Sequence, residues 1–132
     1  MIFVDTSFWA ALMLTRDAHH PEARALLGSV GNEPLVTSNH VRGETWTFLR
    51  RKAGHQAAAA FLDRQMRSRQ LKLVSATAQV EDRAIGWLRE HDEREYSFVD
   101  ATSFALMRSM KIRRALAFDG DFTAAGFEEL RL

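Results

Sequence analysis

The sequence predicts an α/β domain in which a mainly parallel central sheet of short strands is flanked by helices. Two observations lead to this fold class. Short apolar runs alternate with longer segments whose apolar residues recur at helical spacing, and the two clearest runs each stop at an aspartate. The chain has 132 residues, of which 46% are hydrophobic, which is enough to form one core. We therefore expect residues 1–132 to form a single domain.

Five short segments are predicted to be strands. The first, IFV at residues 2–4, is continuously apolar, which indicates that both of its faces are buried in a sheet. Further strands are expected at residues 35–37, 71–74 and 115–118, and a last one near residues 128–132. Because helical segments separate most of these strands, neighbouring strands are expected to run parallel.

The helices of the first half are recognised by their caps. Thr6 or Ser7 is a suitable N-cap for a first, largely buried helix that contains FWAALML. A short helix is expected at residues 22–27 and is predicted to close at Gly28. Ser38 or Asn39 then caps a long helix that ends at Gly54, and the residues of this helix expected to face inward are Val41, Thr45, Phe48 and Leu49.

Three further helices are predicted after Gly54. The first covers residues 55–69, and its inward positions are expected to be Ala57, Ala60, Phe61 and Met66. Thr77 caps the next, whose apolar residues at helical spacing are Val80, Ala84, Trp87 and Leu88. Ser97 caps the last, which is apolar for most of its length and carries Asp100 near its start. This helix must therefore be mostly buried.

Composition excludes several classes of protein. The chain has no cysteine, which rules out disulfides, thiol catalysis and thiolate metal sites. No apolar stretch approaches the roughly 18 residues of a membrane span, and Asp5 interrupts the apolar N-terminus too early for a signal peptide. We therefore expect a cytoplasmic protein without a membrane segment.

The net charge of +1 conceals an uneven distribution along the chain. Residues 42–72 contain eight basic and two acidic side chains, whereas residues 73–100 contain three arginines and seven acids. A basic surface of this kind suits a polyanion such as a nucleic acid. A solvated helix face explains the same pattern equally well.

Four acids are predicted to meet at one edge of the sheet. Asp5 and Asp119 stand at the carboxyl ends of predicted strands, where parallel sheets bind their ligands. Glu44 and Asp100 lie near the starts of helices, which can point into the same crevice. Clustered carboxylates repel one another, so they take up protons or hold a cation.

A hard divalent cation, Mg²⁺ or Mn²⁺, suits such a set of oxygen ligands. An ion of this kind activates water and holds a phosphate oxygen, which is the basis of phosphodiester cleavage. Each acid also has a purely structural explanation. Asp5 can simply end a strand, Asp100 can cap its helix, Glu44 can lie on the surface, and Asp119 and Asp121 can form a turn around Gly120.

Four segments together resemble the motifs of PIN domains, and most closely those of the VapC-type toxins of toxin–antitoxin pairs. They are, in chain order, VDTSFW, SNHVRGETWTFL, YSFVDATSFALM and ALAFDGDF. The resemblance extends over nearly the whole chain, and it implies a single PIN domain over residues 1–132 with the PIN fold.

The resemblance also implies roles for individual residues. It makes a catalytic acidic quartet of Asp5, Glu44, Asp100 and Asp119, in which the three aspartates are the main metal ligands. Thr6 and Asp121 are secondary candidates. One position departs from the family pattern, because Ala117 stands where members commonly have Thr or Ser. The missing hydroxyl is expected to weaken the support of the metal site.

The implied activity is Mg²⁺-dependent endoribonuclease cleavage, often of tRNA or ribosomal RNA, with Mn²⁺ as a substitute ion. The resemblance further implies a VapB-type antitoxin as partner, a homodimer, and contact with DNA only through the antitoxin. Phosphate contacts are expected from the basic segment, and the RNA-binding candidates are Arg42, Arg50, Arg51 and Lys52. The alternative within the same fold is a non-catalytic PIN domain that only binds RNA or protein.

Other classes of protein fit the sequence poorly. A phosphoacceptor receiver domain needs two adjacent acids after its first strand and a lysine after a later strand, whereas Lys111 precedes its strand. A haloacid-dehalogenase-like phosphatase needs Asp-x-Asp after the first strand, whereas the DGD segment here lies near the C-terminus. The five histidines show no pairing at i, i+4, so a zinc site is not predicted.

Overall fold

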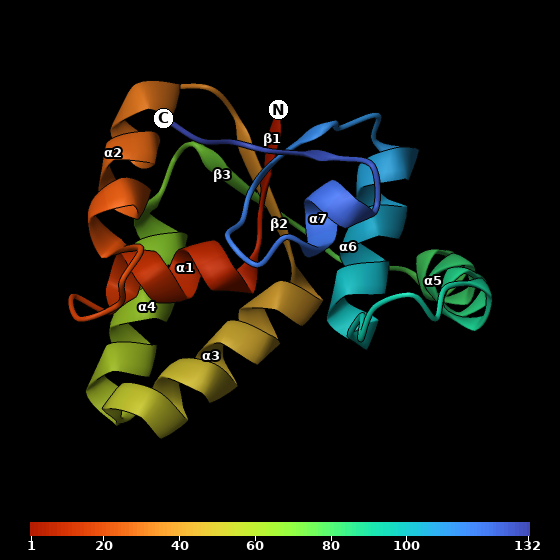
Figure 1. The fold of residues 1–132 in the computed structure, drawn as a ribbon. Helices are drawn as coiled ribbons and strands as arrows, with labels where there is room; N and C mark the ends of the chain where they lie inside the picture. The colour runs from red at the N-terminus through yellow and green to blue at the C-terminus, as the bar shows by residue number, and fades with distance from the viewer.

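The computed structural model describes residues 1–132 and contains a five-stranded sheet in the order β3-β2-β1-β4-β5 (Figure 1). All four strand pairs are parallel, which confirms the predicted parallel α/β architecture and extends it to the entire sheet. The strands are β1 (Ile2–Val4), β2 (Leu35–Ser38), β3 (Leu71–Val74), β4 (Arg114–Leu116) and β5 (Glu128–Glu129).

Seven helices surround the sheet. In Figure 1, α1, α2 and α4 lie to one side of the strands, α5, α6 and α7 lie to the other, and α3 leaves the end of β2 below the sheet. The helices are α1 (Thr6–Met13), α2 (His20–Val30), α3 (Asn39–Ala53), α4 (His55–Arg67), α5 (Ala78–Glu90), α6 (Phe98–Ser109) and α7 (Asp121–Ala124). No helix has both the length and the hydropathy needed to cross a bilayer.

The caps of three helices are those predicted. Ser38, Thr77 and Ser97 begin α3, α5 and α6, and each side chain accepts a hydrogen bond from the backbone N–H three residues later. Gly54 separates α3 from α4 with a φ of 95°, which a side chain rarely tolerates.

Two helix ends differ from the prediction. Asp5, rather than Thr6 or Ser7, is the N-cap of α1, because its carboxylate accepts the N–H of Ser7. Helix α2 starts earlier than expected, with Pro21 in its first turn, and it continues through Gly28. It ends at Gly31, whose φ of 58° makes this glycine, rather than Gly28, the position where the helix stops.

The predicted inward faces are correct in α3 except at one position and only partly correct in α4. Phe48 is 39% exposed, and in α4 Met66 and Ala60 face solvent while Gln65 is buried. Strands β1 and β2 are fully buried, and the ring of Phe122 packs against those of Phe3 in β1 and Phe104 in α6.

The C-terminal region also departs from the prediction in its details. Strand β4 starts and ends earlier than expected, so residues 117–120 form a loop that leads into the short helix α7. Strand β5 has only two residues. Because Val4 pairs with Leu116 and the N–H of Asp5 donates to the Leu116 carbonyl at 3.0 Å, the carboxyl ends of β1 and β4 lie side by side.

Candidate metal centre

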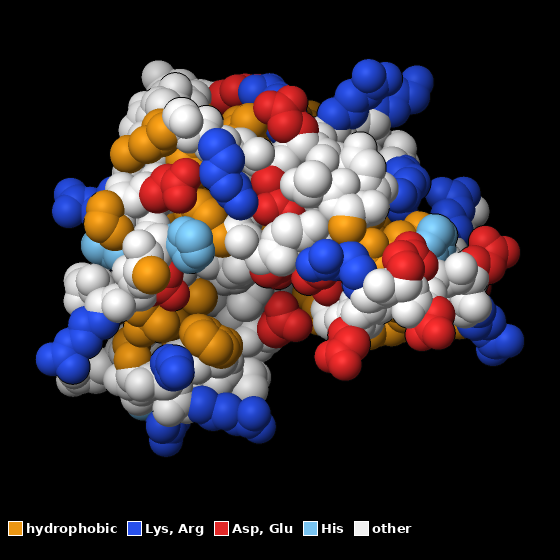
Figure 2. All heavy atoms as spheres, in the orientation of Figure 1, with side chains coloured by type: hydrophobic (Ala, Val, Ile, Leu, Met, Phe, Trp, Pro, Cys, Tyr) orange, Lys and Arg blue, Asp and Glu red, His pale blue; other side chains and the backbone are white.

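The predicted acids converge on one open cleft at the carboxyl edge of the sheet. The cleft has a volume of about 670 Å³, and the acids that line it include Asp5, Glu44, Asp100, Asp119 and Asp121. Figure 2 shows acidic side chains gathered in the hollow between the two halves of this face. The four residues of the predicted quartet, which come from β1, α3, α6 and the end of β4, are therefore brought together, and so is the secondary candidate Asp121.

Asp5 is the most buried of these acids, with 2% of its surface exposed. Its Oδ2 accepts hydrogen bonds from the N–H of Ser7 at 3.2 Å and from the Ser7 hydroxyl at 2.7 Å. Burial, followed by the negative charge of Asp119, raises the pKa of Asp5 to about 8, although the bonds from Ser7 oppose this shift. A nearby cation would oppose the shift as well, because it favours the charged carboxylate.

Asp100 serves as a cap and also faces the cleft. Its Oδ2 accepts the N–H of Ser97 at 2.9 Å, and its own N–H donates to the Ser97 hydroxyl at 2.9 Å, which completes a capping box. Burial, together with the charges of Asp121 and Asp119, raises the pKa of Asp100 to about 6. Asp100 therefore caps its helix, as one of the two explanations of this acid predicts. The cap uses only Oδ2, so Oδ1 has no hydrogen-bond donor from the protein.

Asp119 and Asp121 occupy the turn after β4. Oδ1 of Asp119 accepts the N–H of Asp121 at 3.2 Å, and Gly120 between them has a φ of 82°. The pKa of Asp119 is raised to about 6, first by desolvation in the cleft and then by the charge of Asp121. Single carboxylate oxygens of Asp100, Asp119 and Asp121 lie within 4.8 Å of one another. Asp121 thus belongs to the tightest group of acids.

Glu44 and Thr6 complete the lining of the cleft. Glu44 is half-buried in the second turn of α3. The Thr6 hydroxyl accepts a hydrogen bond from the Thr45 hydroxyl at 3.2 Å, which connects α1 to α3 beside the acids. Apart from the imidazole of His19, the polar side chains that line the cleft are carboxylates and hydroxyls, whose oxygens are the ligands that hard divalent cations prefer. The residues therefore fit Mg²⁺ or Mn²⁺.

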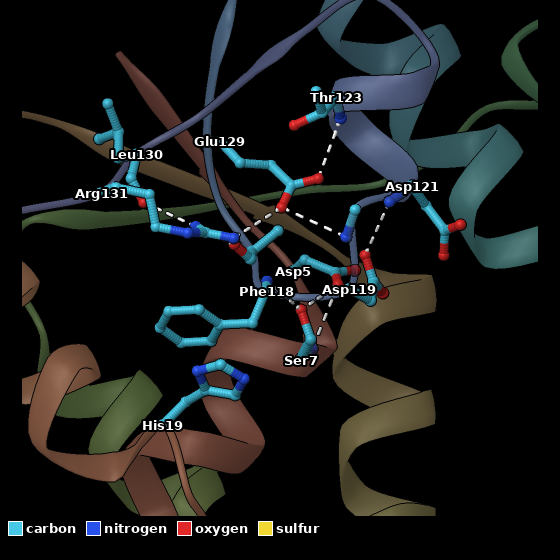
Figure 3. Close-up of polar contacts among 12 residues, drawn as sticks. Asp5, Ser7, His19, Phe118, Asp119, Asp121, Thr123, Glu129, Leu130 and Arg131 are labelled. Atoms are coloured by element: carbon cyan, nitrogen blue, oxygen red, sulfur yellow. Dashed lines mark hydrogen bonds and ion pairs between the residues drawn. The ribbon is translucent and has the colours of Figure 1, made fainter.

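The sequence does not identify Asp17 and Glu95, which line the cleft, nor the two charged residues that contact the acids or their turn, Arg94 and Glu129. Arg94, in the loop before α6, donates its Nε to Oδ1 of Asp121 at 3.0 Å, and its Nη2 lies 2.9 Å from the same oxygen. The Glu129 side chain is 3% exposed and accepts the N–H groups of Gly120 at 3.3 Å and Thr123 at 2.9 Å (Figure 3). The only sequence feature that indicates a role for Glu129 is its charge at a position inside a predicted strand.

The position of Ala117 is supported without a side-chain hydroxyl. Its carbonyl accepts a hydrogen bond from Nη1 of Arg131 at 2.7 Å, and the Arg131 guanidinium also pairs with Glu129 at 3.0 Å. The backbone of the loop that carries Asp119 is therefore held by the side chains of Arg131 and Glu129.

The predicted RNA-binding residues are in different environments. Arg50, Arg51 and Lys52 are exposed on the last turn of α3, and basic side chains gather near this end of the molecule in Figure 2. Arg42 is half-buried and donates its Nε to Oε1 of Gln65 at 2.9 Å. Arg51 also lines a pocket on α3 that includes Glu44.

Comparison with known proteins identifies the family to which this chain belongs. Residues 2–128 match the family described as PIN domain. This chain belongs to the PIN-domain family. It is 57% identical over 132 residues to the 23S rRNA-specific endonuclease VapC20 of two Mycobacterium tuberculosis strains, CDC 1551 / Oshkosh and ATCC 25618 / H37Rv, which covers 99% of this chain and 98% of the relative.

Two solved structures are similar to this chain. The crystal structure of Mycobacterium tuberculosis VapC20, described as a sarcin-ricin loop cleaving toxin, matches with a TM-score of 0.95 and 55% identity, and the match covers 100% of both chains. FitAcB from Neisseria gonorrhoeae matches with a TM-score of 0.67 at 15% identity over 99% of this chain and 97% of that chain, a likeness of fold. The PIN family, the VapC-type likeness and the endoribonuclease class predicted from the motifs are confirmed.

Proposed function

We propose that this PIN domain, formed by residues 1–132, is the toxin of a toxin–antitoxin pair and cuts 23S ribosomal RNA at the sarcin–ricin loop with Mg²⁺ or Mn²⁺. The observation that carries the chemistry is the group formed by Asp100, Asp119 and Asp121, whose oxygens lie within 4.8 Å of one another. The choice of RNA rests on the 57% identity to VapC20 over the full chain.

In this proposal, Asp100, Asp119 and Asp121 hold the ion, and Asp5 adds a fourth carboxylate from the end of β1. The bound ion supplies an activated water and a positive charge for a phosphate oxygen. Glu44 and the Thr6 hydroxyl lie on the same cleft, where they orient water or a phosphate oxygen. Asp5, with a pKa near 8 in the absence of metal, must release its proton as the ion binds.

Two groups keep the acids in place during the reaction. Ser7 holds Asp5 through two hydrogen bonds, and Glu129 holds the turn that carries Asp119 and Asp121. The exposed residues Arg50, Arg51 and Lys52 bind phosphates along the RNA. Arg42 makes a weaker contribution because its Nε is used by Gln65.

The proposed partner is a VapB-type antitoxin. In the proposed complex a homodimer of this chain binds the antitoxin, and only the antitoxin contacts DNA. An antitoxin must block the acid cleft, and a carboxylate cluster favours a guanidinium that replaces the charge of the metal. Arg94 already places a guanidinium on Asp121 in this chain. We therefore expect the antitoxin to place an arginine near Asp5, Asp100 and Asp119. A PIN domain that only binds RNA has no need for this convergence of acids.

The test is cleavage of a hairpin RNA that contains the sarcin–ricin loop sequence. Cleavage is expected with Mg²⁺ or Mn²⁺ and is expected to stop in EDTA. Asp100→Asn should be inactive, whereas Asp82→Asn, an exposed acid on α5, should behave as the wild type. Full cleavage in EDTA would refute the metal mechanism, and cleavage of tRNA but not of the hairpin would refute the substrate.

A further inference from the structure

An aromatic stack forms part of the wall of the acid cleft. His19, in the loop between α1 and α2, stacks on Phe118 with ring centroids 4.5 Å apart and planes 7° apart. Phe118 directly precedes Asp119, and both rings line the cleft that holds the acids. Figure 3 shows the His19 ring beneath Phe118, and in this view Ser7 lies between the His19 ring and Asp119.

Phe118 is a rigid support for the His19 ring. Its N–H donates to the Ser7 hydroxyl at 3.0 Å, the ring of Phe8 lies 5.8 Å away at 22°, and the Arg131 guanidinium lies 5.1 Å from its centroid. The backbone of His19 is held too, because its N–H donates to Oδ1 of Asp17 at 2.8 Å. The stack is therefore set in place before any ligand arrives.

The His19 ring is held in this way but is not buried. Its side chain is 51% exposed, although Phe118 covers one face of the ring. The only ion pair of its side chain is with Glu22 on α2, whose Oε1 lies 3.7 Å from Nδ1, whereas Asp17, which also lines the cleft, contacts only the His19 backbone N–H. Half of the His19 side chain is therefore open to a ligand, at a position that lines the acid cleft.

We propose that His19 and Phe118 form a nucleobase-stacking subsite for a base of the RNA next to the bond that is cut. The proposal rests on the proposed ribonuclease function. Single-stranded RNA is recognised by stacking its unpaired bases on aromatic and histidine rings. His19 and Phe118 line the same cleft as the acids, so a base stacked on the open face of His19 would place its sugar and phosphate within this cleft. Phe48, 39% exposed on the same cleft, offers a second apolar contact.

The test compares His19→Ala with His19→Phe, which keeps an aromatic ring. The matched control is His91→Ala, because His91 stacks on Trp87 with centroids 4.1 Å apart and planes 20° apart but does not line the cleft. Binding of a fluorescent single-stranded RNA is measured in EDTA, and KM and kcat for the hairpin are measured with Mn²⁺. Mn²⁺ affinity is measured without RNA.

We expect His19→Ala to weaken RNA binding and to raise KM by roughly 5- to 100-fold, the range for one stacked base. Its kcat and Mn²⁺ affinity should be those of the wild type, because the stack binds substrate and transition state alike. His19→Phe should keep wild-type binding, and His91→Ala should change nothing.

A scan with abasic nucleotides locates the base. The wild type should bind more weakly when one position near the cut is abasic, and His19→Ala should show no further weakening there. Wild-type binding by His19→Ala, or equal weakening in His19→Ala and His19→Phe, would overturn the subsite even if cleavage is normal. RNA binding that depends on the His19 ring in a protein that cuts no RNA would support the subsite and refute the proposed function.

Discussion

The hydroxyl of Ser7 accepts the N–H of Phe118 at 3.0 Å and so connects the end of β1 to the end of β4. The same hydroxyl donates to Oδ2 of Asp5 at 2.7 Å. Because Phe118 is followed by Asp119, one side chain helps to set the separation of two acids that are far apart in the sequence. This contact, with that of Arg131 on Ala117, holds a loop in which Ala117 has no hydroxyl of its own.

Ser7→Ala tests this connection. The substitution removes the hydroxyl's bond to Asp5 and leaves the Phe118 N–H without its partner, which costs about 1–3 kcal/mol if no water replaces it. We expect weaker Mn²⁺ binding and slower RNA cleavage, measured by calorimetry and single-turnover kinetics, and a lower free energy of unfolding in urea. Ser29→Ala, which removes a bond within α2 only, is the control. Wild-type Mn²⁺ affinity in Ser7→Ala would show that the spacing of the acids does not depend on this hydroxyl.

Asp5→Asn and Asp100→Asn should abolish cleavage while the fold is kept. The amide oxygen of asparagine can still cap a helix, so the starts of α1 and α6 should persist. Each change also removes repulsion among the acids, so the unfolding free energy of the metal-free protein should be unchanged or higher. Circular dichroism, urea unfolding and cleavage assays measure these effects. Retained cleavage in both variants would mean that other residues hold the metal.

Much of the fold was predictable from local signals in the sequence. Ser38, Thr77 and Ser97 were recognised as caps because capping depends on a few neighbouring residues. The end of α2 was misplaced because Gly28 and Gly31 carry the same local signal, and only the packed chain decides which one takes a positive φ. Helix α7 was missed because four residues are too few to show a helical period.

The convergence of the four acids on one cleft could be predicted because each lies at a strand end or a helix start and within a motif. The place of Asp121 in the tightest group could not be predicted, since it depends on the conformation of the turn at Gly120. The contact of Arg94 with Asp121 joins residues 27 positions apart, and no sequence pattern predicts it. Asp5 and Asp100 cap their helices and also line the cleft, so capping does not exclude a role at the site, and that role stays a prediction.

The metal-free protein should become less stable as the pH rises from about 4 to about 8. In the folded state the pKa values of Asp5, Asp100 and Asp119 are raised from 3.8 to about 8, 6 and 6. Between the unfolded and folded pKa values the native state binds more protons, so their contribution is complete at low pH and is lost as the pH rises.

The measurement is the urea-unfolding free energy of the metal-free protein at several pH values. Asp5→Asn should flatten the curve most above pH 6, where only Asp5 of the three still holds its proton. Stabilisation by Mn²⁺ should grow over the same range, because the ion binds the deprotonated carboxylates. A pH profile identical in Asp5→Asn and the wild type would contradict the raised pKa of Asp5.

Arg50→Glu combined with Arg51→Glu should weaken RNA binding and reduce its dependence on salt. Both residues are exposed at the end of α3. For single-stranded RNA, the slope of log K against log salt falls by about 0.7 for each phosphate that the protein no longer neutralises. Mn²⁺ affinity should not change. The control with the same change of charge is Arg83→Glu with Arg89→Glu, on the exposed face of α5. An equal salt slope in the two double variants would show that Arg50 and Arg51 at the end of α3 do not contact phosphates of the RNA.

Arg94→Gln tests whether the guanidinium on Asp121 competes with the metal. In the metal-free protein Arg94 donates to Oδ1 of Asp121 and brings a positive charge next to the tightest group of acids. A bound cation is repelled by this charge and competes with Arg94 for the carboxylate of Asp121. We therefore expect Arg94→Gln to bind Mn²⁺ more tightly, by roughly two- to fivefold at low salt, and the difference to shrink as salt screens the exposed pair.

The measurement is calorimetry of Mn²⁺ binding at two salt concentrations. The control is Arg113→Gln, because Arg113 is exposed just before β4. Weaker Mn²⁺ binding by Arg94→Gln would show instead that Arg94 orients Asp121 for the ion.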